Sequence, residues 1–321
     1  MLADISISFP NLGIEIHDLK KSFEIFGFDI AYYGLIIGIG MLLGILISFR
    51  EAKITGQNVD DYVDLAIFGI IFAIVGARLY YVIFEWDHYK DDLMSILNIR
   101  QGGLAIYGGI IGGVIVGIVV AKVKKLNFWQ LGDTACLGLL VGQICGRWGN
   151  FFNREAFGGD SDGLFAMRIN VDDIYANVRV PNGVSFIDSS CQWIQVQPTF
   201  LYESAWNLMI LILIMIFRRY KKYYGEAFLW YLTGYGVGRF IIEGMRTDQL
   251  IIGNTGIAVS QLLSAVLAIV LGGILIANRV MLIKKGKTIF PFFKMVENKS
   301  SVIETKEKTE VDKNSDEKNE E

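Results

Sequence analysis

One stretch of the sequence gathers polar and basic side chains at the end of an apolar run. Gln143, Arg147 and Asn150 fall at i, i+4 and i+7, which places all three on one face of a helix. Gly146 and Gly149 remove side chains beside the guanidinium, so a ligand or another backbone can approach it closely. A polar contact between helices is the alternative, but the density of polar groups favours an anion site.

A second stretch repeats this pattern inside another apolar run, where ionisable groups are costly and usually face a cavity or a partner. Tyr235, Arg239 and Glu243 fall at i, i+4 and i+8, so a phenol, a guanidinium and a carboxylate form one stripe. Arg239 and Glu243 could simply neutralise each other. A pair of guanidinium groups also suits phosphate, because each planar fork donates two parallel hydrogen bonds. We therefore expect Arg147 and Arg239 to converge on one phosphate-containing ligand.

Four other residues carry weaker signals. Tyr107 lies among closely spaced glycines, whose ordinary role is close helix packing. Tyr33 fits the aromatic belt of a membrane protein, and Glu203 lies near the start of an apolar run, where a helix dipole favours a carboxylate. For Arg78, a structural role is at least as well supported as a functional one.

Neither a metal site nor a cofactor site is expected. His17 and His88 lie outside the apolar runs and lack an acidic or serine partner pattern, while Asp133 is interpreted as an acid in a helix-cap region. The cysteines show no CxxC spacing, which argues against a zinc site or a disulfide framework. They are Cys136, Cys145 and Cys191.

The elements that must position these side chains are membrane-spanning helices. Hydrophobic residues make up 53% of the 321 residues and charged residues only 20%, which argues against a soluble enzyme. A helix needs about 20 apolar residues to cross the hydrocarbon core. Seven runs qualify: 29–49, 63–84, 104–121, 131–147, 200–217, 226–244 and 256–278. We predict an all-α polytopic membrane protein with seven transmembrane helices.

Basic residues in the loops predict the orientation of these helices. A cluster of basic residues follows each of runs one, three, five and seven, and the one after run three is Lys122, Lys124 and Lys125. The loops on the opposite side hold fewer basic residues. Because loops rich in lysine and arginine stay in the cytoplasm, we expect the N-terminus outside and the C-terminus inside. The basic residues are dispersed, so no nucleic-acid partner is indicated.

Two segments outside the helices have their own character. Residues 154–199 are expected to form a small extracytoplasmic cap between helices four and five, with alternating β-branched residues around the turn Pro181-Asn182-Gly183. Residues 1–283 would form the membrane domain. The charged segment 284–321 is expected to be a disordered cytoplasmic tail, because it has too little apolar content to order itself.

The motifs, taken together, resemble one family, the bacterial prolipoprotein diacylglyceryl transferases. The string GRWGNFFNREAFG at 146–158 is similar to the signature of that family. Further similar motifs occur in family order: IAYYG at 30–34, GARLYY at 76–81, GGLAIYGG at 102–109, QPTFLYES at 197–204, GYGVGRFIIEGMR at 234–246 and VSQLLS at 259–264. The resemblance covers residues 28–283, and the combination of motifs is specific.

The resemblance implies a bacterial inner-membrane transferase without a cofactor. Such an enzyme moves the diacylglyceryl group of phosphatidylglycerol to the lipobox cysteine thiol of a prolipoprotein signal peptide, forming a thioether and releasing glycerol phosphate. The implied catalytic residues are Arg147, Arg239, Tyr107 and Glu243. The implied phosphatidylglycerol-binding residues are Arg147, Asn150, Glu155, Gly158, Tyr33 and Tyr235.

One departure from the family pattern concerns the base that removes the thiol proton. Many members have histidine where this chain has Tyr107, and that histidine has been regarded as a catalytic base. A phenol, with a pKa of about 10, is a poor base for a thiol of pKa about 8.5. Our hypothesis is that Tyr107 orients substrate or relays a proton. The two arginines would then lower the thiol pKa, or Glu243 would accept the proton.

Two other classes of function compete with this interpretation. A transporter of a phosphate-containing anion would also use arginines inside the membrane, although no inverted repeat is visible in the sequence. A non-catalytic scaffold assembled through its glycine faces would tolerate loss of both arginines.

Overall fold

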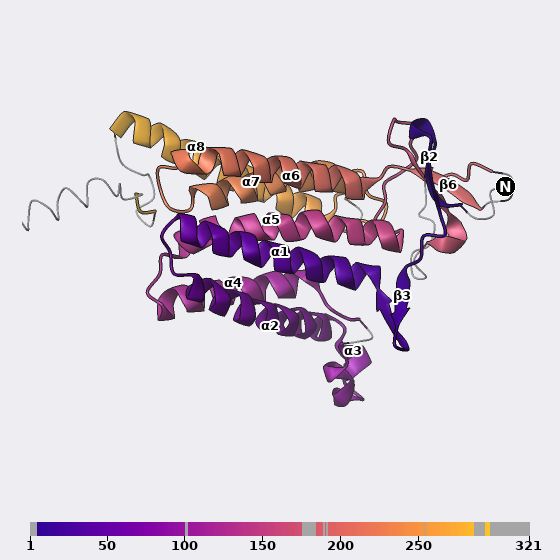
Figure 1. Cartoon of the computed structure of the whole chain (residues 1–321), viewed down its shortest axis with the longest axis horizontal. Helices are drawn as coiled ribbons and strands as arrows, with labels where there is room; N and C mark the ends of the chain where they lie inside the picture. Colours follow the sequence, from indigo (N-terminus) through magenta and orange to yellow (C-terminus); the bar gives the residue numbers. More distant parts are fainter. Residues whose placement is uncertain are drawn as a thin grey trace, which may run out of the picture.

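The chain, seen as a computed structural model, is built from long helices that lie side by side, with its strands gathered at one end (Figure 1). The structure describes residues 5–99, 102–174, 184–188, 190, 192–253, 255–285 and 293–295. Within these residues the long helices are α1 (Tyr32–Ile54), α2 (Val59–Phe84), α4 (Ile106–Val123), α5 (Phe128–Asn153), α6 (Thr199–Phe217), α7 (Glu226–Glu243) and α8 (Val259–Lys285). Each of them overlaps one of the apolar runs in the sequence.

Five of these helices are long and apolar enough to cross a membrane: α1, α2, α4, α6 and α8. The other two, α5 and α7, carry the two arginines of the candidate site, Arg147 and Arg239. Most of the large apolar side chains on the five helices are exposed rather than packed in a core. Exposed apolar faces of this extent fit a lipid environment. The protein is therefore a mostly helical, polytopic membrane protein.

Helix α5 lies at the centre of the packing. It contacts α1 on one side and α6 and α7 on the other, while α2 pairs with α4 and α7 pairs with α8. Glycines permit the closest approaches, because a Cβ at Gly44 would lie 2.5 Å from the carbonyl oxygen of Gly138. The expected close packing is confirmed for Gly108 and Gly112, which face the backbone of α2. Gly113, by contrast, has no atom within 4 Å of a Cβ position.

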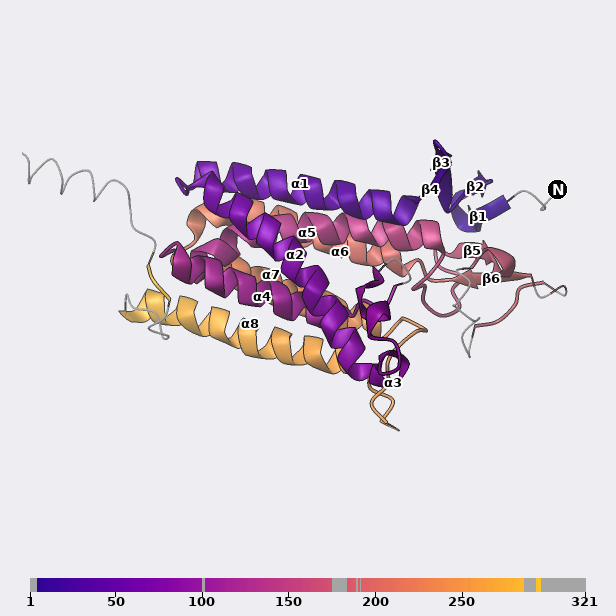
Figure 2. The same cartoon turned by 90° about the horizontal axis from the view of Figure 1, so that it is seen from below.

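A four-stranded antiparallel sheet covers the end of the bundle where α5 finishes and α6 begins (Figure 2). Its order is β2 (Ile14–His17), β1 (Ile5–Phe9), β5 (Met167–Asn170) and β6 (Trp193–Val196). Strands β5 and β6 come from the segment predicted to be β-rich, whereas β1 and β2 were not predicted. The Pro181-Asn182-Gly183 turn lies outside the described residues.

The sheet and the helices share one hydrophobic core. Ile7 of β1 and Ile194 of β6 pack in the same cluster as Phe151, near the end of α5, and Phe200, at the start of α6. Because the bulky side chains on both sides are buried together, the sheet fixes the ends of these two helices. Those are the ends that carry Arg147 and Glu203.

The first helix starts later than the first apolar run. Residues 28–31 form β4 (Phe28–Ala31), which pairs with β3 (Ser22–Ile25) in a hairpin, and α1 begins only at Tyr32. The short elements are η1 (Pro10–Leu12), α3 (Trp86–Tyr89), η2 (Leu93–Leu97), η4 (Val171–Asp173) and η5 (Arg218–Tyr220). Of the predicted tail 284–321, the structure describes only 284–285 and 293–295.

Candidate functional site

Three helices bring two arginines onto one carboxylate. Arg147 of α5 lies 2.9 Å from Glu203 Oε1, and Arg239 of α7 lies 3.2 Å from Glu203 Oε2. The Glu203 side chain, near the start of α6, is only 3% exposed, while the arginines keep 22% and 16% of their surface accessible. The two guanidinium groups therefore converge on the carboxylate of Glu203, and the phosphate-containing ligand stays a prediction.

A second carboxylate completes the charged cluster. Glu243 lies 2.6 Å from Arg239 one helical turn away, and its other oxygen accepts a hydrogen bond from the Ser260 hydroxyl on α8. The intrahelical pairing considered from the spacing thus exists alongside the convergence on Glu203. Two guanidinium groups and two carboxylates balance in charge, which keeps the cost of placing them at membrane depth low.

The signature segment continues this network beyond Arg147. The Asn150 Oδ1 atom accepts a bond of 3.4 Å from Arg147, and the Asn150 side-chain amide donates to Glu155 at 2.9 Å. Asn153 also donates to Glu155, at 3.2 Å. Helix α5 ends at Asn153, and Arg154 follows in the left-handed region with φ 53°. This reversal turns Glu155 back over the last turn of the helix.

Tyr33 and Gly149 meet where α1 contacts α5. A Cβ on Gly149 would lie 2.8 Å from the Tyr33 ring, so only glycine admits the ring at this position. Gly146, three residues earlier, has no atom within 4 Å of its Cβ position. The two glycines of the signature therefore have different surroundings. Gly149 accommodates an aromatic ring, whereas Gly146 has open space at its Cβ position.

Gly158 lies between the chain ends that precede α6 and follow α7. Its amide donates to the Gln197 carbonyl at 2.9 Å, and its Cβ position lies 3.0 Å from the Met245 carbonyl oxygen. Gly158 therefore shapes the frame of the site rather than its charged centre.

An ion pair lies nearby, where Arg246 donates two hydrogen bonds to Asp248, at 2.9 and 2.7 Å. Burial opposes ionisation of Asp248, but these bonds outweigh it and hold the pKa of Asp248 below its usual value.

The phenol of Tyr235 lies within electrostatic range of both arginines and both carboxylates of the cluster. One turn earlier on α7, the Tyr231 hydroxyl accepts a hydrogen bond of 2.9 Å from Gln143. The polar face of α5 is therefore divided. Gln143 binds α7, whereas Arg147 and Asn150 belong to the charged network.

Tyr107 is not brought into this cluster. It lies in the first turn of α4, where its ring contacts Tyr80 of α2 at 6.3 Å between centroids. Within the described part of the chain, Tyr107 makes no hydrogen bond to either arginine. Its proposed catalytic role stays a prediction.

Glu203 lies at the centre of the site, although the sequence predicted it only as a carboxylate near the start of a helix. The signal that could have identified it is the spacing of Glu203 and Asn207 on one face of an otherwise apolar helix, both buried. Ser260 of α8 was also missed, because a hydroxyl in a helix carries little sequence signal.

Arg78 has a structural role, which was one of the two roles, structural or functional, that the sequence allowed. Its guanidinium is buried and donates five hydrogen bonds to backbone carbonyls of the loop between α2 and α4. The acceptors are Ser95, Ile96, Asn98, Gly102 and Gly103. The arginine thereby holds this loop against α2.

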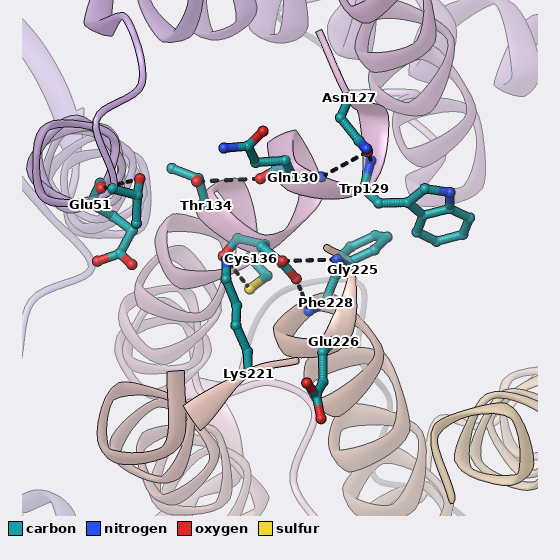
Figure 3. Close-up of polar contacts among 12 residues, drawn as sticks. Glu51, Asn127, Trp129, Gln130, Thr134, Cys136, Lys221, Gly225, Glu226 and Phe228 are labelled. Atoms are coloured by element: carbon teal, nitrogen blue, oxygen red, sulfur yellow. Dashed lines mark hydrogen bonds and ion pairs between the residues drawn. The ribbon is translucent and has the colours of Figure 1, made fainter. Parts of the chain in front are cut away.

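A separate polar cluster lies at the opposite ends of α5 and α7 (Figure 3). Asp133 accepts hydrogen bonds from the amides of Gly225 and Phe228, at 2.8 and 2.9 Å, and lies 3.2 Å from Lys221 Nζ. It caps α7 rather than its own helix, whose N-cap is Asn127. The interpretation of Asp133 as an acid in the cap region of its own helix was therefore wrong, although the residue does cap the start of another helix.

The described part of the chain holds no group of histidine, cysteine and carboxylate side chains arranged for a metal ion. Two free cysteines are described, Cys136, which is buried, and Cys145, which is half-buried. Cys191 lies outside the described residues.

The fold and the site define a polytopic membrane protein with a half-buried arginine pair that is held by carboxylates. Residues 20–277 match the model of the prolipoprotein diacylglyceryl transferase family. The phosphatidylglycerol–prolipoprotein diacylglyceryl transferase of Clostridioides difficile is 41% identical over 268 residues, which is 84% of this chain and 97% of the relative. The enzymes of the same name from Bacillus cytotoxicus and Listeria monocytogenes are 41% and 40% identical, over 81% and 80% of this chain and 90% and 88% of their own lengths. This chain belongs to the prolipoprotein diacylglyceryl transferase family, which makes it a bacterial membrane transferase.

Proposed function

We propose that this protein transfers the diacylglyceryl group of phosphatidylglycerol to the lipobox cysteine thiol of a prolipoprotein. A thioether forms and glycerol phosphate leaves. The observation that carries the proposal is the convergence of Arg147 and Arg239 on the two oxygens of one carboxylate. Two donors held this way match a phosphodiester, which presents two non-bridging oxygens in a similar arrangement.

The geometry suits displacement at a saturated carbon. The bond that breaks joins the glyceryl carbon to a phosphate oxygen, so negative charge grows on the phosphate in the transition state. Two preorganised guanidinium groups in a site of low dielectric stabilise that charge, as is typical of catalysis by electrostatic preorganisation. A Ser-His-Asp arrangement is unnecessary, because no acyl oxyanion forms.

The other site residues have supporting roles in this proposal. Asn150 and Glu155 orient Arg147, Glu243 orients Arg239, and Tyr235 lines the same charged cluster. Tyr33 borders the site through Gly149, and Gly158 shapes its frame. Tyr107 would orient a substrate near the α2–α4 pair, because its ring contacts Tyr80 rather than the arginines.

The proposal includes seven membrane spans, with α5 and α7 crossing alongside the five more apolar helices. Residues 1–283 form the catalytic domain, the segment 154–199 contributes to an extracytoplasmic cap, and 284–321 is a cytoplasmic tail. The N-terminus then lies outside, so the prolipoprotein meets the site from the outer half of the bilayer. No nucleic acid takes part. An anion transporter is not favoured, because the relatives carry the name of a transferase.

The test is a transfer assay with purified protein, phosphatidylglycerol vesicles and a lipobox peptide. Wild type should add the mass of a diacylglyceryl group to the peptide cysteine. Arg147→Gln and Arg239→Gln should each lower kcat by about 100-fold or more, because each removes a donor to the developing charge. Lysine at either position should restore little activity, since it lacks the planar fork.

The matched control is Arg168→Gln on β5. Arg168 is half-buried and bonds the neutral side chain of Gln195 at 2.8 Å, so its loss leaves no unpaired charge. Its activity should equal that of wild type. Transfer that persists in the double variant Arg147→Gln/Arg239→Gln would refute the proposed function.

A further inference from the structure

Glu203 occupies the space that the proposed function gives to phosphate. Each of its carboxylate oxygens lies within hydrogen-bonding distance of a different arginine, at 2.9 and 3.2 Å. The distances and the two-oxygen bridge are those expected of a bound phosphodiester. A phosphate that takes the same two guanidinium nitrogens would displace this carboxylate.

The charges around Glu203 are balanced before any lipid binds. Arg147 faces it from α5, Arg239 and Glu243 face it from α7, and Arg246, paired with Asp248, lies just beyond. Tyr235 is the neutral titratable group that also faces it. These groups sum to zero net charge, so a phosphodiester brings one uncompensated negative charge into the site.

The carboxylates of Glu243 and Glu203 would keep different partners once phosphate has displaced Glu203 from the arginines. Glu243 keeps the hydrogen bond from Ser260 and its pairing within α7. Within the described residues, the Glu203 side chain has no other donor than the two arginines. An ionised carboxylate that is 3% exposed and has lost both cations is costly, and protonation relieves that cost.

We propose that the lipid phosphate displaces Glu203 from Arg147 and Arg239, and that the freed carboxylate accepts the proton of the attacking thiol. This inference rests on the proposed transferase function and names the proton acceptor within it. The S–H bond breaks as a carboxyl O–H bond forms. The sulfur then bonds to the glyceryl carbon, and the electron pair of the breaking C–O bond leaves on the glycerol phosphate, which can take the proton from Glu203 as it departs.

This exchange answers the question that Tyr107 leaves open. The phenol contacts Tyr80 and makes no hydrogen bond to the arginines within the described residues, so it is poorly placed to receive a proton beside the phosphate. Glu203 lies at the phosphate position itself. Binding of the anionic substrate and activation of the thiol are then one coupled event, because the same displacement serves both.

The first experiment uses wild type without and with peptide. When short-chain phosphatidylglycerol binds in detergent micelles without peptide, Glu203 should take up about one proton from water; when the lipobox peptide is bound first, the thiol supplies that proton and the uptake from water should disappear. Calorimetric titrations in two buffers of different ionisation enthalpy measure this uptake. Zwitterionic phosphatidylethanolamine of the same chain length is the comparison lipid. Binding of phosphatidylglycerol with no proton uptake would overturn the inference.

The second experiment separates binding from chemistry in Glu203→Gln. Loss of the competing carboxylate should lower KM for phosphatidylglycerol, while loss of the acceptor should lower kcat by about 100-fold or more. The remaining rate should rise about tenfold per pH unit towards the thiol pKa of about 8.5, because only free thiolate reacts. Glu203→Asp retains an acceptor and should recover part of kcat.

The control is Glu226→Gln, which removes another buried carboxylate from an ion pair, with Arg279 at the opposite end of the bundle. It should lower thermal stability but leave kcat and KM of the folded protein unchanged. If Glu203→Gln raises KM with kcat intact, the residue only positions the arginines and the inference fails. If wild type transfers no lipid at all, the proposed function fails instead.

Discussion

At the scale of single residues, the site illustrates how a carboxylate can substitute for a substrate. Arginine pairs in membranes require counter-ions, and here one counter-ion, Glu203, is shared by both arginines. The shared carboxylate connects three helices, α5, α6 and α7, as well as neutralising charge. Because Glu203 already holds the two guanidinium groups together, the arginines need little movement when phosphate takes its place.

Tyr107 gives a prediction at this scale. Tyr107→Phe should retain turnover, because the ring contact with Tyr80 survives and the hydroxyl makes no hydrogen bond to the arginines within the described residues. Tyr107→Ala should raise KM for the peptide or the lipid, since it removes the ring. Initial rates at varied substrate concentrations measure both effects. A fall in kcat of about 100-fold for the phenylalanine variant would instead assign the hydroxyl a role in proton transfer.

At the scale of elements, the site depends on how closely helices approach. The ring of Tyr33 in α1 lies directly over Gly149 in α5, in the turn that follows Arg147. The sheet adds a second constraint, because its core is continuous with the end of α5 and the start of α6. Both constraints act on the helix ends that carry the charged cluster.

The contact with Tyr33 predicts a specific cost for a small substitution. Gly149→Ala would place a methyl group 2.8 Å from the ring, which should destabilise the protein by about 1–3 kcal/mol and lower transfer activity. Thermal unfolding in detergent and the peptide assay measure the two effects. Gly142→Ala in the same helix is the control, since its Cβ position is open. Equal behaviour of the two variants would contradict the proposed contact.

At the scale of the whole molecule, the two ends of the helix bundle carry different kinds of polar groups. One end holds the sheet and the arginine cluster, and the other holds ion pairs that join helix ends, such as Asp133 with Lys221 and Glu226 with Arg279. This polarity fits a protein that receives its peptide substrate on one side of the membrane and is fixed by basic loops on the other.

The proposed orientation can be tested by labelling. In a variant without the native cysteines, Asn11→Cys beside the sheet should react with a membrane-impermeant maleimide on intact spheroplasts. Lys53→Cys near the end of α1 should react only after the membrane is opened. Both positions are exposed, so access to the membrane face decides the result. The reverse labelling pattern would require the opposite topology.

The sequence by itself determined the membrane character, the seven apolar runs, and the faces on which Arg147 and Arg239 lie. These follow from local periodicity and composition, which every segment carries independently of the fold. Only the tertiary structure decided that Glu203 bridges the arginines and that the ring of Tyr107 contacts Tyr80. It also decided that the N-terminal strands β1 and β2 complete the sheet. Such facts depend on which distant segments pack together, and helical spacing within one segment holds no information about its partners.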